Sequence, residues 1–211
     1  MDMKKSLHTK ILPGNQLKLF EELSSISFIK DFYLAGGTCL ALQIGHRQSI
    51  DFDFFIPDDF DTAAIINRLT QIGTYQRSHE EHNTINGILN EVRISFFGYK
   101  YPMVDDFLIY RQMRLAGPRD LAAMKLEAIA GRGSKKDFID LYFLLQQFQL
   151  REIFTFHTQK YGTGLSNQYH LLKSLIYFED AEDEVMPVMR EPLQWTDAKK
   201  LIINQAKRFQ L

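Results

Sequence analysis

Apolar residues recur with two different periods in the first part of the chain. Over residues 17–29 they return about every three positions, which predicts an amphipathic helix. The short apolar run at 32–34 predicts a buried strand, and the adjacent Gly36 and Gly37 end it. The chain is therefore expected to begin with a helix and then a strand that stops at a flexible glycine turn.

Carboxylates alternate with apolar residues in the next predicted strand. Thr38 can cap a helix that Gly45 would end. Over 49–56 the sequence then alternates, with Asp51 and Asp53 each followed by phenylalanine. Because side chains two positions apart on a strand share a face, we expect both carboxylates on one face and the apolar residues on the buried face.

The remaining pattern divides the chain into an α/β half and a helical half. The stretch 102–114 fits neither period. The character changes near Gly117-Pro118, which predicts an α/β (α+β) fold: residues 1–117 form the sheet-containing core and 118–211 a helical part, packed as one globular unit. The other expected elements are a helix over 63–72 capped by Asp61 or Thr62, antiparallel strands over 84–90 and 92–99 joined near Asn90-Glu91, and helices over 120–131, 134–148, 151–161, 168–178 and 196–209.

Composition indicates a folded globular chain. Of the 211 residues, 45% are hydrophobic and 24% charged, a mix that rules out disorder, collagen-like repeats and coiled coil as the main state. No run of about 18 uncharged apolar residues occurs, so no membrane span is expected. The N-terminal MDMKKSLHTK lacks the apolar core of a signal peptide, which favours a cytoplasmic protein.

Cysteine content and charge exclude further classes. The single cysteine, Cys39, excludes an internal disulfide and a cysteine-built zinc site, and we expect it to be buried behind the glycine turn. A net charge of −1 gives no global attraction to nucleic acid. Any such contact needs a local basic patch; Arg132, Lys135 and Lys136, with Arg119 upstream, are the candidate, and a solvated helix start explains them equally well.

The glycine pair and the two aspartates together indicate a nucleotide site. Two glycines between a strand and a helix let the backbone approach a ligand closely, and the helix N-terminus offers free N–H groups to a phosphate. Asp51 and Asp53 would repel each other unless a divalent cation lay between them. Mg²⁺ or Mn²⁺ suits such hard oxygen donors and would bridge nucleotide phosphates. Each part alone is commonly a turn or a solvated face, whereas the ordered combination is specific.

The order Gly-Gly, spacer, Asp-hydrophobic-Asp-hydrophobic is similar to the signature of the polymerase-β-type nucleotidyltransferase superfamily. The runs 33–55 and 120–141, the second containing Lys125 and Asp137, resemble the AbiEii/AbiGii-type nucleotidyltransferases. Those proteins are toxins of abortive-infection and toxin–antitoxin systems. The resemblance covers about residues 32–199 and implies the superfamily's fold, a small mixed sheet with a C-terminal helical bundle.

The resemblance implies a role for each matching residue. It implies metal ligands at Asp51 and Asp53, a Lys125 that neutralises phosphate charge, and Asp137 as an acid near the site. These four residues form the expected catalytic set. The implied nucleotide-binding residues are Gly36, Gly37, Thr38, Arg47, Ser49, Lys125 and Lys136.

One carboxylate of the superfamily has no counterpart in the matching strand. A third acid usually comes from that neighbouring strand and activates the attacking hydroxyl in two-metal chemistry. The corresponding strand in this chain, residues 92–97, offers Arg93 and Ser95 but no acid. Glu91, at its start, is a poor substitute. Asp137 or Asp140 would have to supply the third acid, or the reaction runs differently.

Ordinary structural roles are alternatives for several of these side chains. Asp137 lies three residues after Ser134 in a capping-box arrangement, and Asp140 can pair with Lys136 across one helical turn. His46 is expected to satisfy a helix end. Two further histidines, His79 and His82, lie in a polar stretch, which favours a solvated loop over a metal site.

The resemblance implies transfer of a nucleoside monophosphate from an NTP to an acceptor hydroxyl. The implied acceptors are tRNA, another RNA or a protein, with a cognate antitoxin as partner. One alternative is a module of the same fold that binds a nucleotide or a partner without catalysis. A second is an enzyme that modifies a small cationic molecule such as an aminoglycoside, using the acidic run 179–184.

Overall fold

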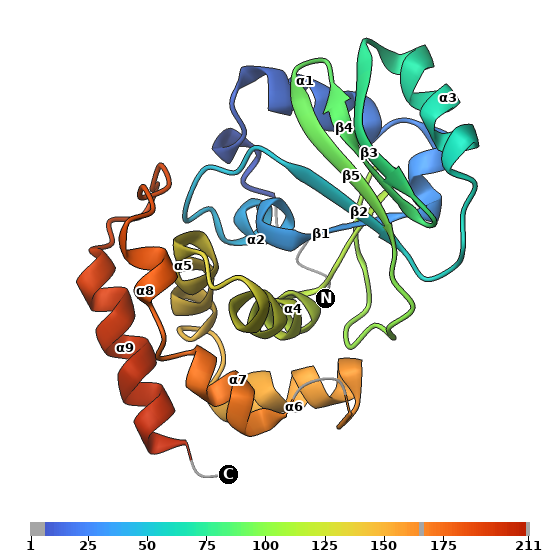
Figure 1. Cartoon of the computed structure of the whole chain (residues 1–211). Helices are drawn as coiled ribbons and strands as arrows, with labels where there is room; N and C mark the ends of the chain where they lie inside the picture. The colour runs from blue at the N-terminus through green and yellow to red at the C-terminus, as the bar shows by residue number, and fades with distance from the viewer. Residues whose placement is uncertain (1–6, 165–166, 210–211) are drawn as a thin grey trace, which may run out of the picture.

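The computed structural model describes residues 7–164 and 167–209 and contains a mixed sheet with helices packed around it (Figure 1). Part of the N-terminal segment, residues 1–6, lies outside the described residues. In the described chain seven strands form one sheet in the order β3-β4-β5-β2-β1-β7-β6. The strands are β1 (Tyr33–Ala35), β2 (Phe52–Ile56), β3 (Tyr75–Glu81), β4 (Thr84–Leu89), β5 (Val92–Gly98), β6 (Leu108–Tyr110) and β7 (Met113–Leu115).

Helices cover both faces of the sheet. Figure 1 shows α1 and α3 on one side, and α4 on the other, where it packs against α6 and the rest of the helical part. The helices are α1 (Gly14–Leu23), α2 (Gly36–Ile44), α3 (Thr62–Ile72), α4 (Pro118–Gly131), α5 (Lys135–Leu144), α6 (Leu150–Tyr161), α7 (Gln168–Ser174), α8 (Glu179–Glu182) and α9 (Trp195–Arg208), with 3-10 turns η1 (Thr9–Ile11) and η2 (Ser27–Asp31). None of the described helices is long and apolar enough to cross a bilayer. The expected fold class is confirmed.

The alternation in β2 has the consequence expected of a strand with one buried face. Phe52 and Phe54 are fully buried, whereas Asp53 is only partly buried. Phe54 stacks on Phe96 of β5 at 5.2 Å between ring centroids, and Phe52 lies 6.1 Å from Phe20 of α1. The face that carries Asp53 is therefore left for polar chemistry, because aromatic packing occupies the other.

Several boundaries differ from the sequence prediction. The helix expected over 17–29 is wrong in its second half, because α1 ends at Leu23 and a 3-10 turn follows. Ser24 explains the break: its hydroxyl donates to the Glu21 carbonyl at 2.8 Å and competes with the helical hydrogen bonds. Thr38 is not a cap, since α2 begins at Gly36 with Ala35 as its N-cap residue; Gly45 ends the helix as predicted, with φ +81°.

Two parts of the sheet escaped prediction. The polar segment expected as a loop around His79 is strand β3, an edge strand with both faces largely exposed and therefore without apolar alternation. The ambiguous stretch 102–114 contains the hairpin β6–β7. The predicted antiparallel pair β4–β5 is present, and its two-residue turn, Asn90-Glu91, has φ values of +48° and +68°, as a tight hairpin requires.

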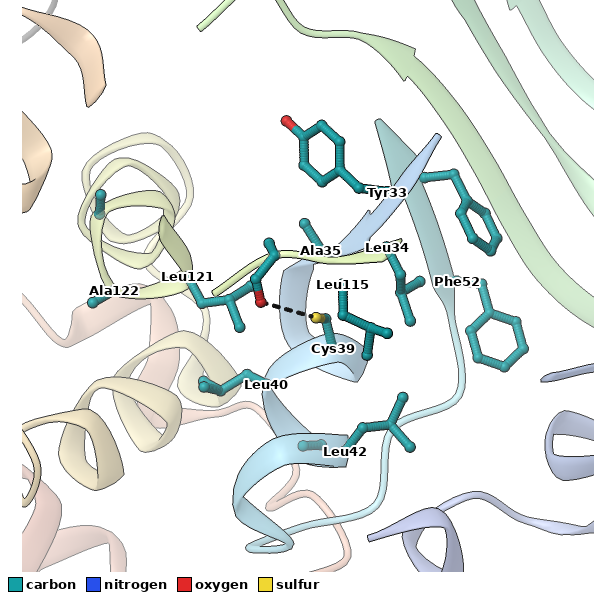
Figure 2. Close-up of a cluster of buried hydrophobic side chains, with 14 of the residues drawn as sticks. Tyr33, Leu34, Ala35, Cys39, Leu40, Leu42, Phe52, Leu115, Leu121 and Ala122 are labelled. Atoms are coloured by element: carbon teal, nitrogen blue, oxygen red, sulfur yellow. Dashed lines mark hydrogen bonds between the residues drawn. The ribbon is translucent and has the colours of Figure 1, made fainter. Parts of the chain in front are cut away.

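The helix after β1 packs on the sheet through a dense apolar cluster (Figure 2). Leu40 and Leu42 of α2 are fully buried in this cluster. Cys39 is also fully buried, and its thiol donates to the carbonyl oxygen of Ala116 at 3.7 Å, the dashed line in Figure 2. The expected burial of Cys39 is confirmed, and the cluster fixes the position of the glycine turn that precedes it.

Candidate active site

The backbone between β1 and α2 approaches other groups so closely that only glycine is accommodated. Gly36 has φ +70°, and a Cβ placed on it would lie 2.8 Å from Oδ2 of Asp53. A Cβ on Gly37 would lie 2.6 Å from an Nη2 atom of Arg47. The first turn of α2 therefore lies directly against a carboxylate of β2 and a guanidinium of the following loop.

The two aspartates lie at the start of β2, beside this turn. Ala35 of β1 is opposite Asp53 in the antiparallel register, and Asp51 directly precedes the strand. Burial and the neighbouring Asp51 raise the pKa of Asp53 above its ordinary value, although Arg132 and Lys125 act in the opposite direction. The Oδ1 atom of Asp51 is buried and has no hydrogen-bond partner among the described residues. Neither carboxylate forms a direct ion pair with a described residue, and the nearby cations offset the charge of Asp53 only in part.

A cavity of about 470 Å³ opens at these carboxylates. The cations of the lining come from the loop after α2, from β5, from α4 and its C-terminal end, and from α5. Thr38 and Ser49 contribute two hydroxyl groups, which hydrogen-bond to each other at 2.7 Å. The lining residues are Gly37, Thr38, Arg47, Gln48, Ser49, Ile50, Asp51, Asp53, Arg93, Lys125, Arg132, Lys136, Pro187 and Val188. The structure brings together every residue predicted from the sequence to contact nucleotide or metal except Gly36, which lies behind Asp53.

A fully buried carboxylate on α5, Asp140, holds two of the cavity's cations. Its Oδ1 accepts from Arg47 Nε at 2.7 Å, and its Oδ2 accepts from Arg47 Nη2 at 2.8 Å and lies 2.7 Å from Lys125 Nζ. His46 Nε2 lies 2.7 Å from the same Oδ1. Burial alone raises the pKa of Asp140, but Arg47 and Lys125 outweigh it and hold that pKa well below its ordinary value. The pairing of Asp140 with Lys136 is wrong, because Asp140 points inward.

Asp137, one turn earlier on α5, extends this charged network. It accepts from Lys125 Nζ at 2.9 Å, from Arg132 Nε at 2.8 Å and from the Ser134 hydroxyl at 2.7 Å. Lys125 and Arg132 lower the pKa of Asp137 despite its burial. Ser134 is the N-cap residue of α5, but the predicted capping box is wrong in its hydrogen bonds: the Ser134 hydroxyl donates to the Asp137 carboxylate and accepts no backbone N–H. Asp137 and Asp140 thus orient cations, and neither lines the cavity.

The strand next to β2 contributes no acid to the site. β5 runs parallel to β2 with Ser95 opposite Asp53. Arg93, two residues before Ser95 on the same strand, lines the cavity. Within residues 7–164 and 167–209 no group of three or more His, Cys, Asp or Glu side chains could hold a metal ion. Asp51 and Asp53 nevertheless fit Mg²⁺, because this ion is commonly bound by one or two carboxylates with substrate phosphates and water completing its shell.

Two of the four residues of the predicted basic patch, Arg132 and Lys136, line the cavity. Lys135 is buried and donates to the Glu182 carbonyl at 3.0 Å, and Arg119 lies 3.5 Å from Asp105. Neither of these two residues lines the cavity, because backbone carbonyls hold the Lys135 ammonium and Asp105 pairs with Arg119.

Two other sequence features lie away from the cavity lining. His79 of the exposed β3 edge lies 3.8 Å from a carboxylate oxygen of Glu81. In the acidic run, Glu182 accepts from Trp195 Nε1 at 2.9 Å and so ties α8 to α9. Since no residue of the run 179–184 lines the cavity, a cationic acceptor would find no acidic pocket there.

One segment of the lining was not found by the sequence analysis. Residues 183–191, which we name the C-terminal strap, connect α8 toward α9 and place Pro187 and Val188 in the cavity wall. The strap pairs with the loop after α2: Gln48 N donates to Val188 O at 2.8 Å. It has neither a motif nor a periodic pattern, so only the tertiary pairing reveals it.

Comparison with solved structures shows which proteins share this fold. The structure is similar to MenT4, a nucleotidyltransferase toxin from Mycobacterium tuberculosis, with a TM-score of 0.62 and 13% identity over 93% of this chain and 85% of that one. It is also similar to JHP933 from Helicobacter pylori (TM-score 0.55, 14% identity, 92% and 89% covered) and to a putative nucleotidyltransferase from H. pylori (0.56, 14%, 92% and 95%). The fold is that of the nucleotidyltransferase toxins.

Sequence comparison narrows the class to a family. Residues 18–106 match the family described as nucleotidyl transferase AbiEii toxin, type IV toxin–antitoxin system. An uncharacterized protein from Aquifex aeolicus is 36% identical over 208 residues, covering 94% of this chain and 97% of that protein. The chain belongs to the AbiEii nucleotidyltransferase toxin family. The resemblance predicted from the sequence is confirmed.

Proposed function

We propose that the protein transfers a nucleoside monophosphate from an NTP to an acceptor hydroxyl and releases pyrophosphate. The observation that carries the proposal is the pair Asp51 and Asp53, which line a cavity together with several cations although neither carboxylate forms a direct ion pair with a described residue. Membership of the nucleotidyltransferase family supports the reaction class. Asp51 and Asp53 would hold Mg²⁺ or Mn²⁺, which would supply positive charge to stabilise the transferred group.

The residues of this chain position the reactants and balance their charge. The Gly36-Gly37 turn and the start of α2 offer backbone N–H groups to the triphosphate. Lys125 and Arg47, held in place by Asp140, face phosphate oxygens with fixed geometry. Thr38 and Ser49 bond each other and hold the loop that carries Asp51. Lys136 and Arg132 add positive charge at the cavity mouth.

The transfer itself is an in-line displacement at the α-phosphorus. The acceptor oxygen forms a bond to phosphorus as it loses its proton, and the bond to the bridging oxygen breaks so that pyrophosphate leaves with that electron pair. Positioning and charge neutralisation supply most of the rate enhancement in such reactions. Because β5 carries no acid beside Asp53, we propose that another group of the acceptor or solvent water takes the proton that the hydroxyl loses.

The biological role that we propose is that of a toxin in a toxin–antitoxin or abortive-infection system. Family membership and the MenT4-like fold support that role. We further propose tRNA, another RNA or a protein as acceptor, a cognate antitoxin as partner, and a cytoplasmic site of action. The cations at the cavity mouth are compatible with a polyanionic acceptor.

Transfer of label from α-³²P-NTP tests the proposal directly. The purified protein is incubated with each of the four NTPs, Mg²⁺ or Mn²⁺, and total tRNA or a protein extract. We expect label in the acceptor with the wild type and none with Asp51→Asn or Asp53→Asn. Asp58→Asn, an exposed aspartate outside the cavity, is the matched control. Label transfer retained by both site variants would refute the proposed mechanism.

The second candidate is a module that binds Mg·NTP without turnover. The absence of a carboxylate on β5, where Ser95 lies opposite Asp53, favours this candidate. Calorimetry that shows Mg·NTP binding in a protein with no label transfer to any acceptor would select it over the enzyme.

A further inference from the structure

The candidate active site has one uncharged wall. Of the fourteen residues that line the cavity, the large apolar ones are Ile50, Pro187 and Val188. Ile50 is 50% exposed and Val188 is 61% exposed, although the described chain buries most of its other isoleucines and valines more deeply. Exposed apolar side chains that converge on a polar cavity indicate a ligand with an apolar part.

The C-terminal strap holds this wall in a fixed position. Its backbone pairs with the loop after α2 at Val188 and two residues beyond it: Gln48 N donates to Val188 O at 2.8 Å, and Arg190 N donates to His46 O at 2.8 Å. At its other end, Lys135 N donates to Glu184 Oε2 at 2.8 Å. The wall is therefore pre-organised, which lowers the entropy cost of binding against it.

The lining of the cavity combines cations with apolar side chains. The cations Lys125, Arg132 and Lys136 come from α4, its C-terminal end and α5, and Arg47 and Arg93 come from the loop after α2 and from β5; the apolar Ile50 and Val188 come from that loop and from the strap. An NTP has both kinds of surface, since its triphosphate is polyanionic and its base is a flat heterocycle with apolar faces. Ile50 directly precedes Asp51, so the apolar wall begins one residue from the proposed metal site.

We propose that Ile50, Pro187 and Val188 form the subsite for the nucleobase of the NTP. This inference rests on the proposed function. The triphosphate lies among the cations, and one face of the base packs on the side chains of Ile50 and Val188. Contact with a π-face is tolerant of base identity, because every base presents such a face. The strap is thus a part of the nucleotide site that lies about 140 positions from the aspartates in sequence.

Calorimetric titration of a matched pair of strap variants tests the subsite. Val188→Ala shortens the wall, and Val185→Ala is the control, because Val185 lies on the same strap, is 91% exposed and does not line the cavity. The probes are the Mg²⁺ complexes of the α,β-methylene analogues of the four NTPs and of tripolyphosphate, which has no base. Thermal unfolding confirms that both variants remain folded.

We expect Val188→Ala to weaken analogue binding by about three- to tenfold, in line with the loss of partly buried methyl groups. Tripolyphosphate binding is expected to stay unchanged, and Val185→Ala to leave both probes unaffected. Unchanged analogue binding in Val188→Ala overturns the inference, and so does an equal loss for both probes. Normal analogue affinity with impaired label transfer also overturns it, because the wall would then contact the acceptor. A wild type that binds neither probe refutes the proposed function itself.

Discussion

Individual side chains at the site are defined by the charges around them. Asp53 and Asp51 repel each other at the start of β2. Asp137 and Asp140, both on α5, are instead each surrounded by cations from other segments. Burial acts in the same direction on three of these carboxylates, so the sign of each pKa shift is set by the neighbours. Two aspartates are thus suited to bind a cation, and two are suited to hold Lys125 and its neighbours in place.

The repulsion between Asp51 and Asp53 predicts that the thermal stability of the protein depends on Mg²⁺. Mg²⁺ should raise the melting temperature of the wild type, because it binds the folded pair and has no comparable site in the unfolded chain. Asp53→Asn removes the repulsion, so we expect a higher melting temperature than wild type without Mg²⁺ and little further gain with it. Differential scanning fluorimetry with and without Mg²⁺ measures both. An equal Mg²⁺ response in the two proteins would contradict metal binding at Asp53.

The network around Asp140 predicts a loss of stability in acid. The pKa values of Asp137 and Asp140 lie below their ordinary values in the folded state, so the unfolded chain takes up protons first as pH falls. Their contribution is complete above about pH 4 and declines below it. Urea unfolding from pH 7 to pH 2.5 should show this decline.

Asp140→Asn tests the same network at neutral pH. The substitution leaves Arg47 and Lys125 buried without their shared carboxylate, and breaking such a buried pair costs about 3–5 kcal/mol. We expect a lower unfolding free energy at pH 7 and a shallower decline in acid. A pH profile parallel to that of the wild type would show that Asp140 is not responsible.

At the level of elements, the site is built by one short strand–turn–helix unit. β1 ends at Ala35, and the glycines allow α2 to begin at once against β2. The apolar residues of α2 then anchor the turn in the core, as Figure 2 shows for Leu40 and Leu42. The position of the predicted phosphate site therefore depends on packing beneath it.

Cys39 reports on the integrity of this element. Burial raises the pKa of its thiol to about 12, and it has no exposed surface. We expect no reaction with a thiol reagent such as DTNB at pH 8 in the folded protein and complete reaction in denaturant, because only the thiolate is nucleophilic. Rapid modification of the native protein would show that α2 opens locally from the sheet.

At the level of the whole molecule, a second buried ion pair joins the helical part to the segment between β5 and β6. Lys160 of α6 donates to Asp120 of α4 at 2.7 Å and to the Pro102 carbonyl at 3.1 Å, and both side chains are fully buried. Asp120 also accepts from the Val104 amide at 3.0 Å. The pair lies outside the cavity lining, so its role is to hold the parts of the chain together.

Lys160→Met tests this separation of stability from function. The variant leaves Asp120 buried with its backbone donors alone, and we expect a loss of about 3 kcal/mol in unfolding free energy. Mg·NTP affinity should remain within twofold of the wild type at a temperature where both proteins are folded. Urea denaturation and calorimetry measure the two quantities. A selective loss of nucleotide binding would show that the pair is coupled to the site.

The sequence alone determined the features that depend on local pattern. The alternation around Asp51 and Asp53 required a strand with one buried face, and the Gly36-Gly37 pair marked the point where a strand ends and a helix begins, although both glycines belong to the helix and not to a turn before it. Because these patterns are local, they identified the sheet, the family and the residues of the candidate site. Strand β3 escaped because an exposed edge imposes no apolar period.

Only the tertiary structure decided which charges compensate one another. The inward direction of Asp140, the hydrogen bonds of Lys135 to backbone carbonyls and the wall formed by Val188 all depend on contacts between segments 45 or more residues apart. Such contacts arise from how helices pack on the sheet, and no periodicity in the chain encodes them. The sequence therefore specified the chemistry of the site, and the packing specified its shape and its electrostatic balance.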